Sequence, residues 1–483
     1  MKLNYKIIFH FFGLLLLFNG GFMLLSALVS LIYEDGVTFQ IFLAGITNLI
    51  VGIIAMVFTK NHSKEMNKRE GYMVVSFGWI IMSLSGTLPY LFTGSIPDFT
   101  NAFFETISGY TTTGASILND IEAVPKGVLF WRSLTHWIGG MGIIVLAIAI
   151  LPLLGIGGMQ LFAAEAPGPS ADKLHPRITD TAKRLYLIYV TLTLAQFFLL
   201  KVAGMTWFDA IGHSFSTVAI GGFSTHDESM GYFKSNAIDT VAIVFMLLSS
   251  ANFSLHFLVW RKRNPRLYFQ DSELRFYLYC VTVISLICIT YLYIGHQFST
   301  LSETIYKSLF QVVSMITTTG FTTSEYVYWT SFLPVLLIFS SFMGGCAGST
   351  AGGMKVVRVL LLLKQGIREI LRLIHPSARL SVKLNRKPVP DNVMQAVWGF
   401  FSVYIGIFVF FMLLIMATGL DQVTAFSAVA ATLNNLGPGL GKVASNYAEI
   451  NDFAKWVLTI AMLLGRLEIF TLLVVLTPVF WRQ

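Results

Sequence analysis

Long apolar segments separated by short polar loops dominate this chain. Nine of them have about 20 residues or more, the length needed to cross the hydrocarbon core of a bilayer. They are 8–32, 39–58, 72–92, 128–151, 185–202, 237–260, 276–294, 393–417 and 453–480. A tenth apolar segment, 332–363, is interrupted by glycines. The pattern predicts a polytopic membrane protein whose helices cross the bilayer ten times.

Four shorter segments, 99–111, 207–219, 302–317 and 421–434, are too short to cross a bilayer, and each runs into a glycine-bearing stretch. We call these stretches the glycine tracts; they are Thr112-Thr113-Gly114, Ile220-Gly221-Gly222, Thr318-Thr319-Gly320 and Asn435-Leu436-Gly437. They recur at intervals of roughly 100 residues, which indicates an internal repeat. Each tract lies between two spanning segments, so the predicted unit is a spanning helix, a half-length helix, a tract and a second spanning helix. Because each unit crosses twice, successive units share one orientation and can bring four tracts to the same depth.

The predicted fold class is therefore an all-α polytopic membrane protein. Four parallel helix–pore-loop–helix repeats surround a central pore, preceded by two extra transmembrane helices. The predicted boundaries are 1–70 for the leading helices and 71–180, 181–270, 271–390 and 391–483 for the four repeats. Residues suited to begin the half-length helices as N-caps are Thr100 or Asn101, Asp209, Ser302 and Asp421. Glu105 and Glu303 are expected in the first turns, near the positive helix end.

Composition excludes a soluble protein of this length, since 55% of residues are hydrophobic, 12% are charged and the mean hydropathy is +0.69. A net charge of +8 would suggest nucleic acid as a partner of a soluble protein. Here Lys and Arg gather in alternate loops, as the positive-inside rule describes, and acidic residues gather in the others. We therefore expect both termini in the cytoplasm, the glycine tracts open to the outside, and no nucleic-acid partner.

Enzymatic chemistry has little support in the sequence. The cysteines Cys280, Cys288 and Cys346 show no metal or redox spacing. Residues 437–442 resemble a phosphate loop only superficially, because the glycine spacing is wrong and Val443 stands where Ser or Thr is required. The chain is not predicted to be an enzyme.

The glycine tracts carry the candidate chemistry. Glycine permits backbone angles that direct carbonyls inward, and stacked carbonyls can replace the hydration shell of a cation. Each half-length helix ends at its tract, so its partly negative carboxyl end points to the same place. The predicted cation ligands are the backbone carbonyls of all four tracts. A single tract would be read as a helix cap, but four at matching positions favour a shared pore.

A second glycine-rich stretch, 344–355, breaks the tenth apolar segment. It contains Gly344, Gly345, Gly348, Ser349, Gly352, Gly353 and Lys355. Glycines are costly in a helix, and irregular backbone exposed to lipid would leave polar groups unsatisfied. We therefore expect this stretch, called the glycine loop below, to face the pore and act as a gate; close packing of helices through small residues is the alternative.

Arg466 lies near the middle of the last apolar segment, where a buried cation is read as functional by default. Glu468 is only two residues further on and so lies on another face of the helix. Arg466 is therefore assigned to the gate, with a salt bridge to another helix as the structural alternative.

The residues around the tracts resemble the four selectivity-filter loops of the Trk/Ktr/HKT potassium-uptake superfamily. The matching strings are SGYTTTGA (108–115), TVAIGGFST (217–225), ITTTGF (316–321) and NNLGPG (434–439). The resemblance covers nearly the whole chain, and the two leading segments are similar to the TrkH branch. Members that favour sodium replace the first filter glycine with serine, whereas this chain keeps Gly114.

The resemblance implies potassium (K+) uptake across the bacterial inner membrane, with K+ held in the filter and released through an intramembrane gating loop at 344–355. It implies that an arginine at the position of Arg466 lies under the filter as an electrostatic barrier. It also implies a homodimer and a cytoplasmic TrkA-type regulatory subunit that binds nucleotides, since this chain has no nucleotide site. An ion-coupled (Na+ or H+) symporter and a less selective K+/Na+ pathway remain alternatives. Coupling normally uses buried carboxylates on inverted broken helices, so the parallel repeats favour a gated conduit.

Overall fold

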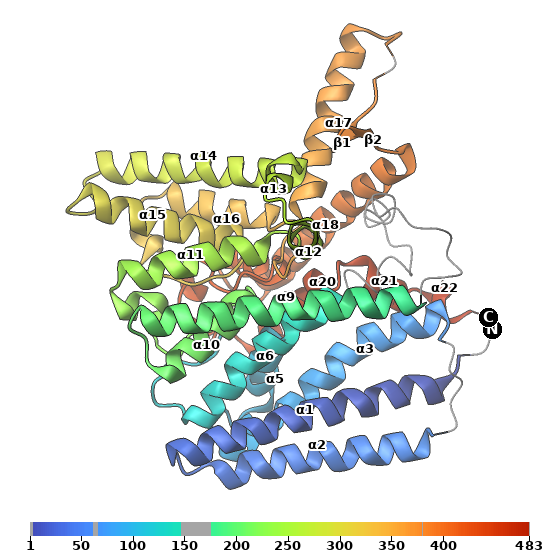
Figure 1. Cartoon of the computed structure of the whole chain (residues 1–483), viewed down its shortest axis with the longest axis vertical. Helices are drawn as coiled ribbons and strands as arrows, with labels where there is room; N and C mark the ends of the chain where they lie inside the picture. The colour runs from blue at the N-terminus through green and yellow to red at the C-terminus, as the bar shows by residue number, and fades with distance from the viewer. Residues whose placement is uncertain (1–2, 61–65, 146–174, 379, 483) are drawn as a thin grey trace.

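The computed structural model describes residues 3–60, 66–145, 175–378 and 380–482. Most of this part of the chain is helical, with its long helices running side by side (Figure 1). The end of the predicted segment 128–151 lies outside the described residues.

Two leading helices, α1 (Tyr5–Tyr33) and α2 (Thr38–Phe58), form an antiparallel pair at one side of the molecule (Figure 1). Glycines allow their backbones to touch, since a Cβ atom on Gly20 would lie 2.8 Å from the carbonyl oxygen of Gly45. Small residues at such contacts are the usual means of close packing between helices in membranes. The prediction of two helices ahead of the repeats is confirmed.

Four helical groups follow. The first contains α3 (Lys68–Gly86), α4 (Leu88–Thr93), α5 (Phe99–Tyr110) and α6 (Lys126–Val145). The second contains α9 (His175–Val202), α10 (Trp207–Val218), η3 (Ser229–Phe233), α11 (Asn236–Ser250), α12 (Phe253–Lys262) and α13 (Arg266–Gln270). The third contains α14 (Ser272–Ile294), α15 (Leu301–Ile316), η4 (Tyr326–Tyr328), α16 (Leu333–Met343) and α17 (Val356–Ile374).

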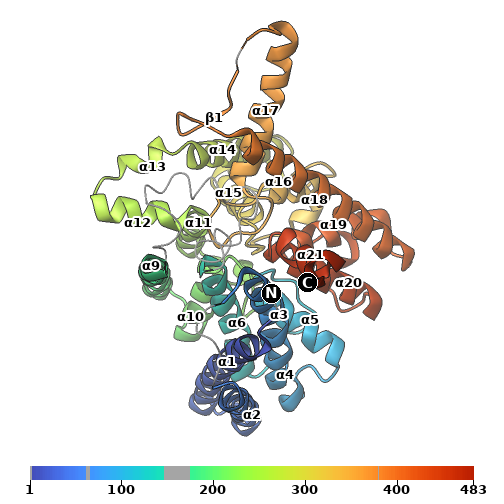
Figure 2. The same ribbon diagram turned by 90° about the vertical axis from the view of Figure 1, so that its right-hand side faces the viewer.

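A short antiparallel hairpin of β1 (Lys383–Leu384) and β2 (Lys387–Pro388) leads to the fourth group. That group contains α18 (Asp391–Ala417), α19 (Gln422–Leu433), η5 (Gly441–Val443), α20 (Asp452–Arg466), α21 (Phe470–Leu476) and α22 (Pro478–Trp481). Figure 2 shows the four groups arranged in sequence around a common centre, with α1 and α2 at the periphery.

The half-length helices α5, α10, α15 and α19 begin in the same way. In each, a side-chain oxygen of the N-cap accepts the N–H three residues later: Asp98 from Asn101, Thr206 from Asp209, Thr300 from Glu303, and Asp421 from Thr424. Only Asp421 was predicted as a cap. In the other three helices the cap lies two or three residues before the predicted one, because the capping side chain lies just outside the apolar segment.

Six helices of the described chain are long and apolar enough to cross a membrane, and two bent helix pairs raise the number to as many as eight. The expectation of continuous helices over 237–260 and 453–480 is wrong. The helix bends by 94° between α11 and α12 and by 115° between α20 and α21. At the first bend, Asn252 accepts the N–H of Ser254 and so starts a new helix. At the second, Glu468 and Ile469 both have positive φ, which an α-helix cannot accommodate.

Candidate cation pathway

The four glycine tracts adopt one backbone conformation. The first residue of each has a positive φ: 48° for Thr112, 55° for Ile220, 65° for Thr318 and 54° for Asn435. The glycine at the third position also has a positive φ: 83° for Gly114, 82° for Gly222, 82° for Gly320 and 97° for Gly437. Such angles are rare for residues other than glycine. The fourth tract, which has Asn and Leu in place of threonines, shares the geometry of the others.

Hydrogen bonds to the preceding helix hold each tract in this conformation. The N–H of the second tract residue donates to the carbonyl five residues earlier: Thr113 to Ser108 (2.9 Å), Gly221 to Ser216 (2.8 Å), Thr319 to Ser314 (2.8 Å) and Leu436 to Ala431 (2.7 Å). The carbonyls of the first two residues of each tract accept no hydrogen bond from any described residue. The donors are thus used at the helix ends, and the carbonyl oxygens stay available for a ligand.

The tracts close into a ring. A Cβ atom added to the glycine at the third position of each tract would lie very close to a carbonyl oxygen of the next tract. The distances are 2.1 Å from Gly114 to Gly221, 2.0 Å from Gly222 to Thr319, 2.1 Å from Gly320 to Leu436 and 2.6 Å from Gly437 to Thr113. Each glycine therefore presses against the tract of the next repeat, and the fourth against the first. The four tracts meet around one axis, as the repeat pattern predicts. That their carbonyls bind a cation stays a prediction.

Side chains in and next to the tracts form hydrogen bonds with one another. The hydroxyls of Thr111 and Thr113 lie 2.8 Å apart, and those of Thr317 and Thr319 lie 2.7 Å apart. In the fourth tract, Nδ2 of Asn435 donates to the Thr113 hydroxyl at 2.9 Å. The amide therefore joins the last repeat to the first, a contact that a threonine side chain is too short to reproduce.

The glycine loop lies against the carboxyl ends of the half-length helices. The N–H of Gly352 donates to the Thr318 hydroxyl at 2.7 Å, and that of Gly353 donates to the carbonyl of Asn434 at 3.0 Å. The Thr350 hydroxyl donates to the carbonyl of Val218 at 2.9 Å. All the residues predicted for the gate between 344 and 355 lie in this one loop, in contact with repeats two, three and four.

Glu273, near the start of α14, anchors the glycine loop and was not identified from the sequence. Its side chain is 5% exposed, and its Oε1 accepts the N–H of Ala347 at 2.7 Å and that of Val357 at 3.1 Å. One carboxylate thus holds a residue inside the loop and a residue at the start of α17. No sequence signal connects Glu273 with the loop, because it lies 74 residues before Ala347.

Arg466 is 2% exposed, and its Nη1 donates to the carbonyl of Thr350, in the glycine loop, at 2.9 Å. Its Nε and Nη2 have no hydrogen-bond partner among the described residues. Glu468 does not neutralise it, because that carboxylate pairs with Arg358 at 2.5 Å. Within the described ranges no ion pair involves Arg466, so the salt-bridge alternative has no support there. The ammonium group of Lys355 donates to the carbonyl of Ala351 and thus stays within the loop.

A buried ion pair lies within the first repeat, and its arginine also bonds to the second; this pair was missed as well. Arg132 of α6 pairs with Glu105 at 2.7 Å and donates to the carbonyl of Ser224 at 2.8 Å. Glu105 also accepts the N–H of Ile117 at 2.8 Å. The expectation that Glu105 favours the positive end of its helix is wrong, because Glu105 lies in the middle of α5 and pairs with Arg132 instead.

His226 follows the second tract and links two loops at the mouth of the ring. Its Nδ1 lies 2.9 Å from Glu122, and its Nε2 lies 3.3 Å from Asp209. Burial alone would lower the pKa of His226, but the contacts with Asp209 and Glu122 outweigh burial and raise the pKa above its ordinary value. Among the described residues no group of three His, Cys, Asp or Glu side chains could hold a metal ion.

Known proteins match this chain over its whole length. It is 50% identical to the Trk system potassium uptake protein TrkH of Vibrio parahaemolyticus and 49% identical to that of Escherichia coli, with 100% of each chain covered in both comparisons. It is 40% identical to the Trk system potassium uptake protein TrkG of Escherichia coli over 99% of both chains.

A comparison with solved structures agrees with the sequence comparisons. The fold matches the crystal structure of the potassium transporter TrkH from Vibrio parahaemolyticus with a TM-score of 0.92 and 48% identity, covering 99% of this chain and 100% of the other. The family model described as cation transport protein matches residues 37–481. The chain therefore belongs to the TrkH family of cation transport proteins.

Proposed function

We propose that this protein takes up potassium ions through the ring formed by the four glycine tracts. The closed ring carries the proposal, because it brings together four tracts whose first two carbonyls accept no hydrogen bond from any described residue. The names of its relatives support potassium as the ion, since the TrkH proteins about half identical to it are potassium uptake proteins.

In this mechanism the ring replaces the water around a dehydrated ion with backbone oxygens of the twelve tract residues. The half-length helices direct their partly negative ends at the same point and so favour a cation. The glycine loop blocks the path beneath the ring, and the guanidinium of Arg466, bonded to Thr350, adds positive charge there. A cation passes when the loop moves and carries its carbonyls and the bound guanidinium off the axis.

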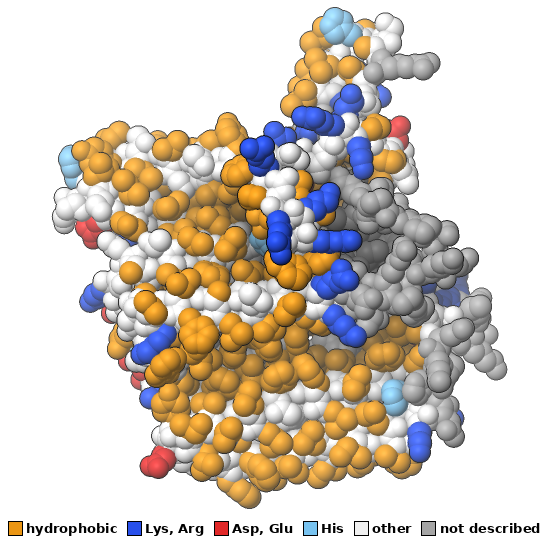
Figure 3. Space-filling model, in the orientation of Figure 1, with side chains coloured by type: hydrophobic (Ala, Val, Ile, Leu, Met, Phe, Trp, Pro, Cys, Tyr) orange, Lys and Arg blue, Asp and Glu red, His pale blue; other side chains and the backbone are white. Residues whose placement is uncertain are grey.

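We place the protein in the bacterial inner membrane, with both termini in the cytoplasm and the ring open to the outside. Figure 3 shows basic side chains gathered over α12, α13 and the base of α17, and the exposed residues there include Arg261, Lys262, Arg263 and Arg266. Basic residues gather on the cytoplasmic side of membrane proteins. The boundaries at residues 70, 180, 270 and 390 are part of this proposal.

We propose a homodimer and a nucleotide-binding partner of the TrkA type for the same chain. The helix α17 extends away from the helical body (Figure 1) and leaves Ile367, Ile370, Leu373 and Ile374 more than half exposed. An exposed apolar helix face of this kind marks an interaction surface. The basic side chains at its base are available to a cytoplasmic partner.

A coupled symporter is the second candidate, favoured by buried carboxylates such as Glu105, Glu273 and Glu468. Two of these are held by arginines, and the third accepts two backbone N–H groups. Reversal potentials in liposomes separate the two mechanisms. A potential that follows the potassium gradient alone supports the conduit, and one that shifts with pH or with sodium supports coupling. Rubidium uptake with sodium as competitor tests selectivity in the same vesicles.

A further inference from the structure

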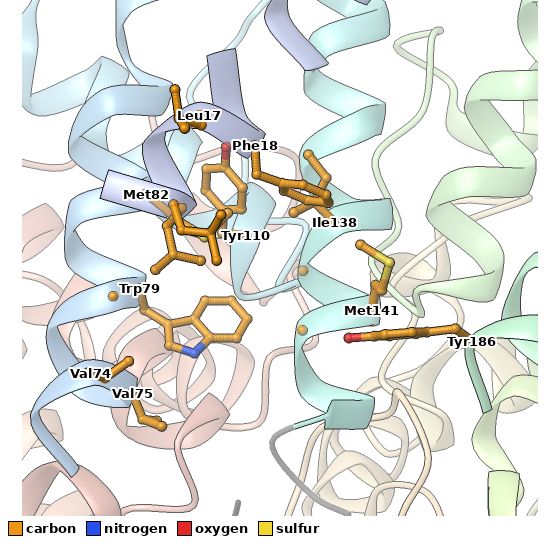
Figure 4. A pocket seen from close by; sticks show the side chains of 15 residues that line it. Leu17, Phe18, Val74, Val75, Trp79, Met82, Tyr110, Ile138, Met141 and Tyr186 are labelled. Atoms are coloured by element: carbon orange, nitrogen blue, oxygen red, sulfur yellow. The ribbon is translucent and has the colours of Figure 1, made fainter. Parts of the chain in front are cut away.

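A large apolar cavity lies between the first leading helix and the first two repeats. Its volume is about 620 Å³, within the range of about 300–1,000 Å³ typical of ligand sites. Its walls come from α1, α3, α6 and α9, and Figure 4 shows side chains from all four directed at the same space. Along α3 the lining runs from Val74 to Met82, a rise of about 12 Å at 1.5 Å per residue. The cavity therefore extends along α3, in the direction in which lipid chains lie.

The inner end of the cavity reaches the base of the first glycine tract. Tyr110, the last residue of α5, lines it, and the Tyr110 hydroxyl is already bonded to Asn19. Gly139 lines it as well, and a Cβ atom on Gly139 would lie 1.9 Å from the carbonyl oxygen of Tyr110. An occupant of the cavity thus contacts the residues that hold the first tract in place.

Basic residues lie near the end of the cavity that is opposite the first glycine tract. Lys183 and Arg184 are exposed and stand one turn or less before Tyr186, which lines the cavity from α9. Lys68 is exposed at the first residue of α3, whose Val74 also lines the cavity. In Figure 1, α3 and α9 start on the same side of the molecule. Cations at the membrane surface beside an apolar site match the phosphate of an anionic lipid.

We propose that this cavity binds one acyl chain of an anionic phospholipid whose phosphate lies among Lys68, Lys183 and Arg184. Water does not suit the site, because it needs several polar partners and the lining is almost wholly apolar. A hydrocarbon chain supplies van der Waals contacts to the lining. Because the surrounding bilayer is equally apolar, the specificity comes from packing and from the basic end, not from the hydrophobic effect.

Trp79 provides a direct measurement, because its ring lines the cavity (Figure 4). The protein is reconstituted into phosphatidylglycerol vesicles whose acyl chains carry bromine, which quenches tryptophan on contact. The contribution of Trp79 is the difference between the parent protein and the Trp79→Phe variant. We expect that contribution to be quenched relative to vesicles without bromine.

The Gly142→Leu variant places a side chain in the cavity, since a Cβ atom there lies 3.5 Å from the Trp79 ring. We expect it to restore the fluorescence of Trp79. The matched control is Gly406→Leu on α18, where no atom lies within 4 Å of the added Cβ, and it should leave the quenching unchanged. If Gly142→Leu does not fold, Gly142→Val introduces a smaller group at the same place.

Trp79 fluorescence that is unquenched in the parent, or quenched equally in the Gly142 variant, overturns the acyl-chain site. The headgroup is tested in mixtures of phosphatidylglycerol and phosphatidylcholine in which only one lipid carries bromine. Stronger quenching by brominated phosphatidylglycerol, lost in the Lys183→Gln/Arg184→Gln double variant, supports the basic end. Equal quenching by the two lipids overturns it.

Discussion

Glu273 provides the sharpest test of the glycine loop as a gate. In the Glu273→Ala variant the N–H groups of Ala347 and Val357 lose their acceptor while they stay buried. An unsatisfied buried donor costs about 1–3 kcal/mol, so the closed loop loses roughly 2–6 kcal/mol. Since about 1.4 kcal/mol corresponds to a factor of ten, the lower bound shifts the equilibrium toward an open loop by roughly 30-fold.

The measurement is rubidium uptake into liposomes that contain the purified chain without a partner. Uptake should rise in Glu273→Ala and rise less in Glu273→Gln, because the amide oxygen of glutamine can still accept the two N–H groups that alanine leaves without an acceptor. Glu449→Ala, which removes an exposed glutamate, serves as the control and should match the parent.

A Glu273→Ala protein that elutes and melts like the parent, yet takes up rubidium at the parent rate, would refute this reasoning. In that case Glu273 stabilises the fold at α14 without any influence on the closed state of the loop. An equal rise in the Glu449→Ala control would refute it as well, because the effect would then not depend on the loop.

Three further results are expected. Gly320→Ala should abolish potassium uptake, since its Cβ would lie 2.1 Å from a carbonyl oxygen of the next tract, whereas Gly399→Ala, with no atom within 4 Å of the new Cβ, should keep parental uptake in the same assay. Arg466→Ala should raise ion flux measured in liposomes, because a buried cation on the path is removed; unchanged or lower flux in a folded variant contradicts the barrier. Because the folded-state pKa of His226 is raised, its ion pair with Glu122 stabilises the protein fully below about pH 6.5 and this stabilisation fades as the pH rises through the raised pKa. The melting-temperature difference between the parent and His226→Gln should therefore shrink with rising pH, and a constant difference would contradict the assignment.

The sequence predicts the repeated unit well because that unit is local. Apolar length, a half-length helix and a following glycine are all contained in about fifty residues, and the fourfold recurrence supports each assignment. Even the fourth tract, where Asn435 and Leu436 replace threonines, adopts the common backbone conformation. The conformation depends on the helix end and on the glycine, both of which every tract has.

Features that depend on contacts between helices could not be predicted in this way. The bend after Ser250 occurs without proline or glycine, because Asn252 begins a new helix beside the glycine loop. The ion pair of Arg132 with Glu105 depends on the packing of α6 against α5. Only the fold identifies Glu105 as the partner of Arg132.

Breaks in the second helices of repeats two and four are bonded to the glycine loop, which is the break in repeat three. Polar backbone freed at a break cannot face lipid, so it must bond within the protein. The N–H of Cys346 donates to the carbonyl of Ser250 at 2.9 Å, and Arg466 donates to the carbonyl of Thr350 at 2.9 Å. The break in repeat three is thus bonded to those in repeats two and four. If the glycine loop opens as proposed, it must either release the carbonyl of Ser250 and the guanidinium of Arg466, or move together with α11 and α20.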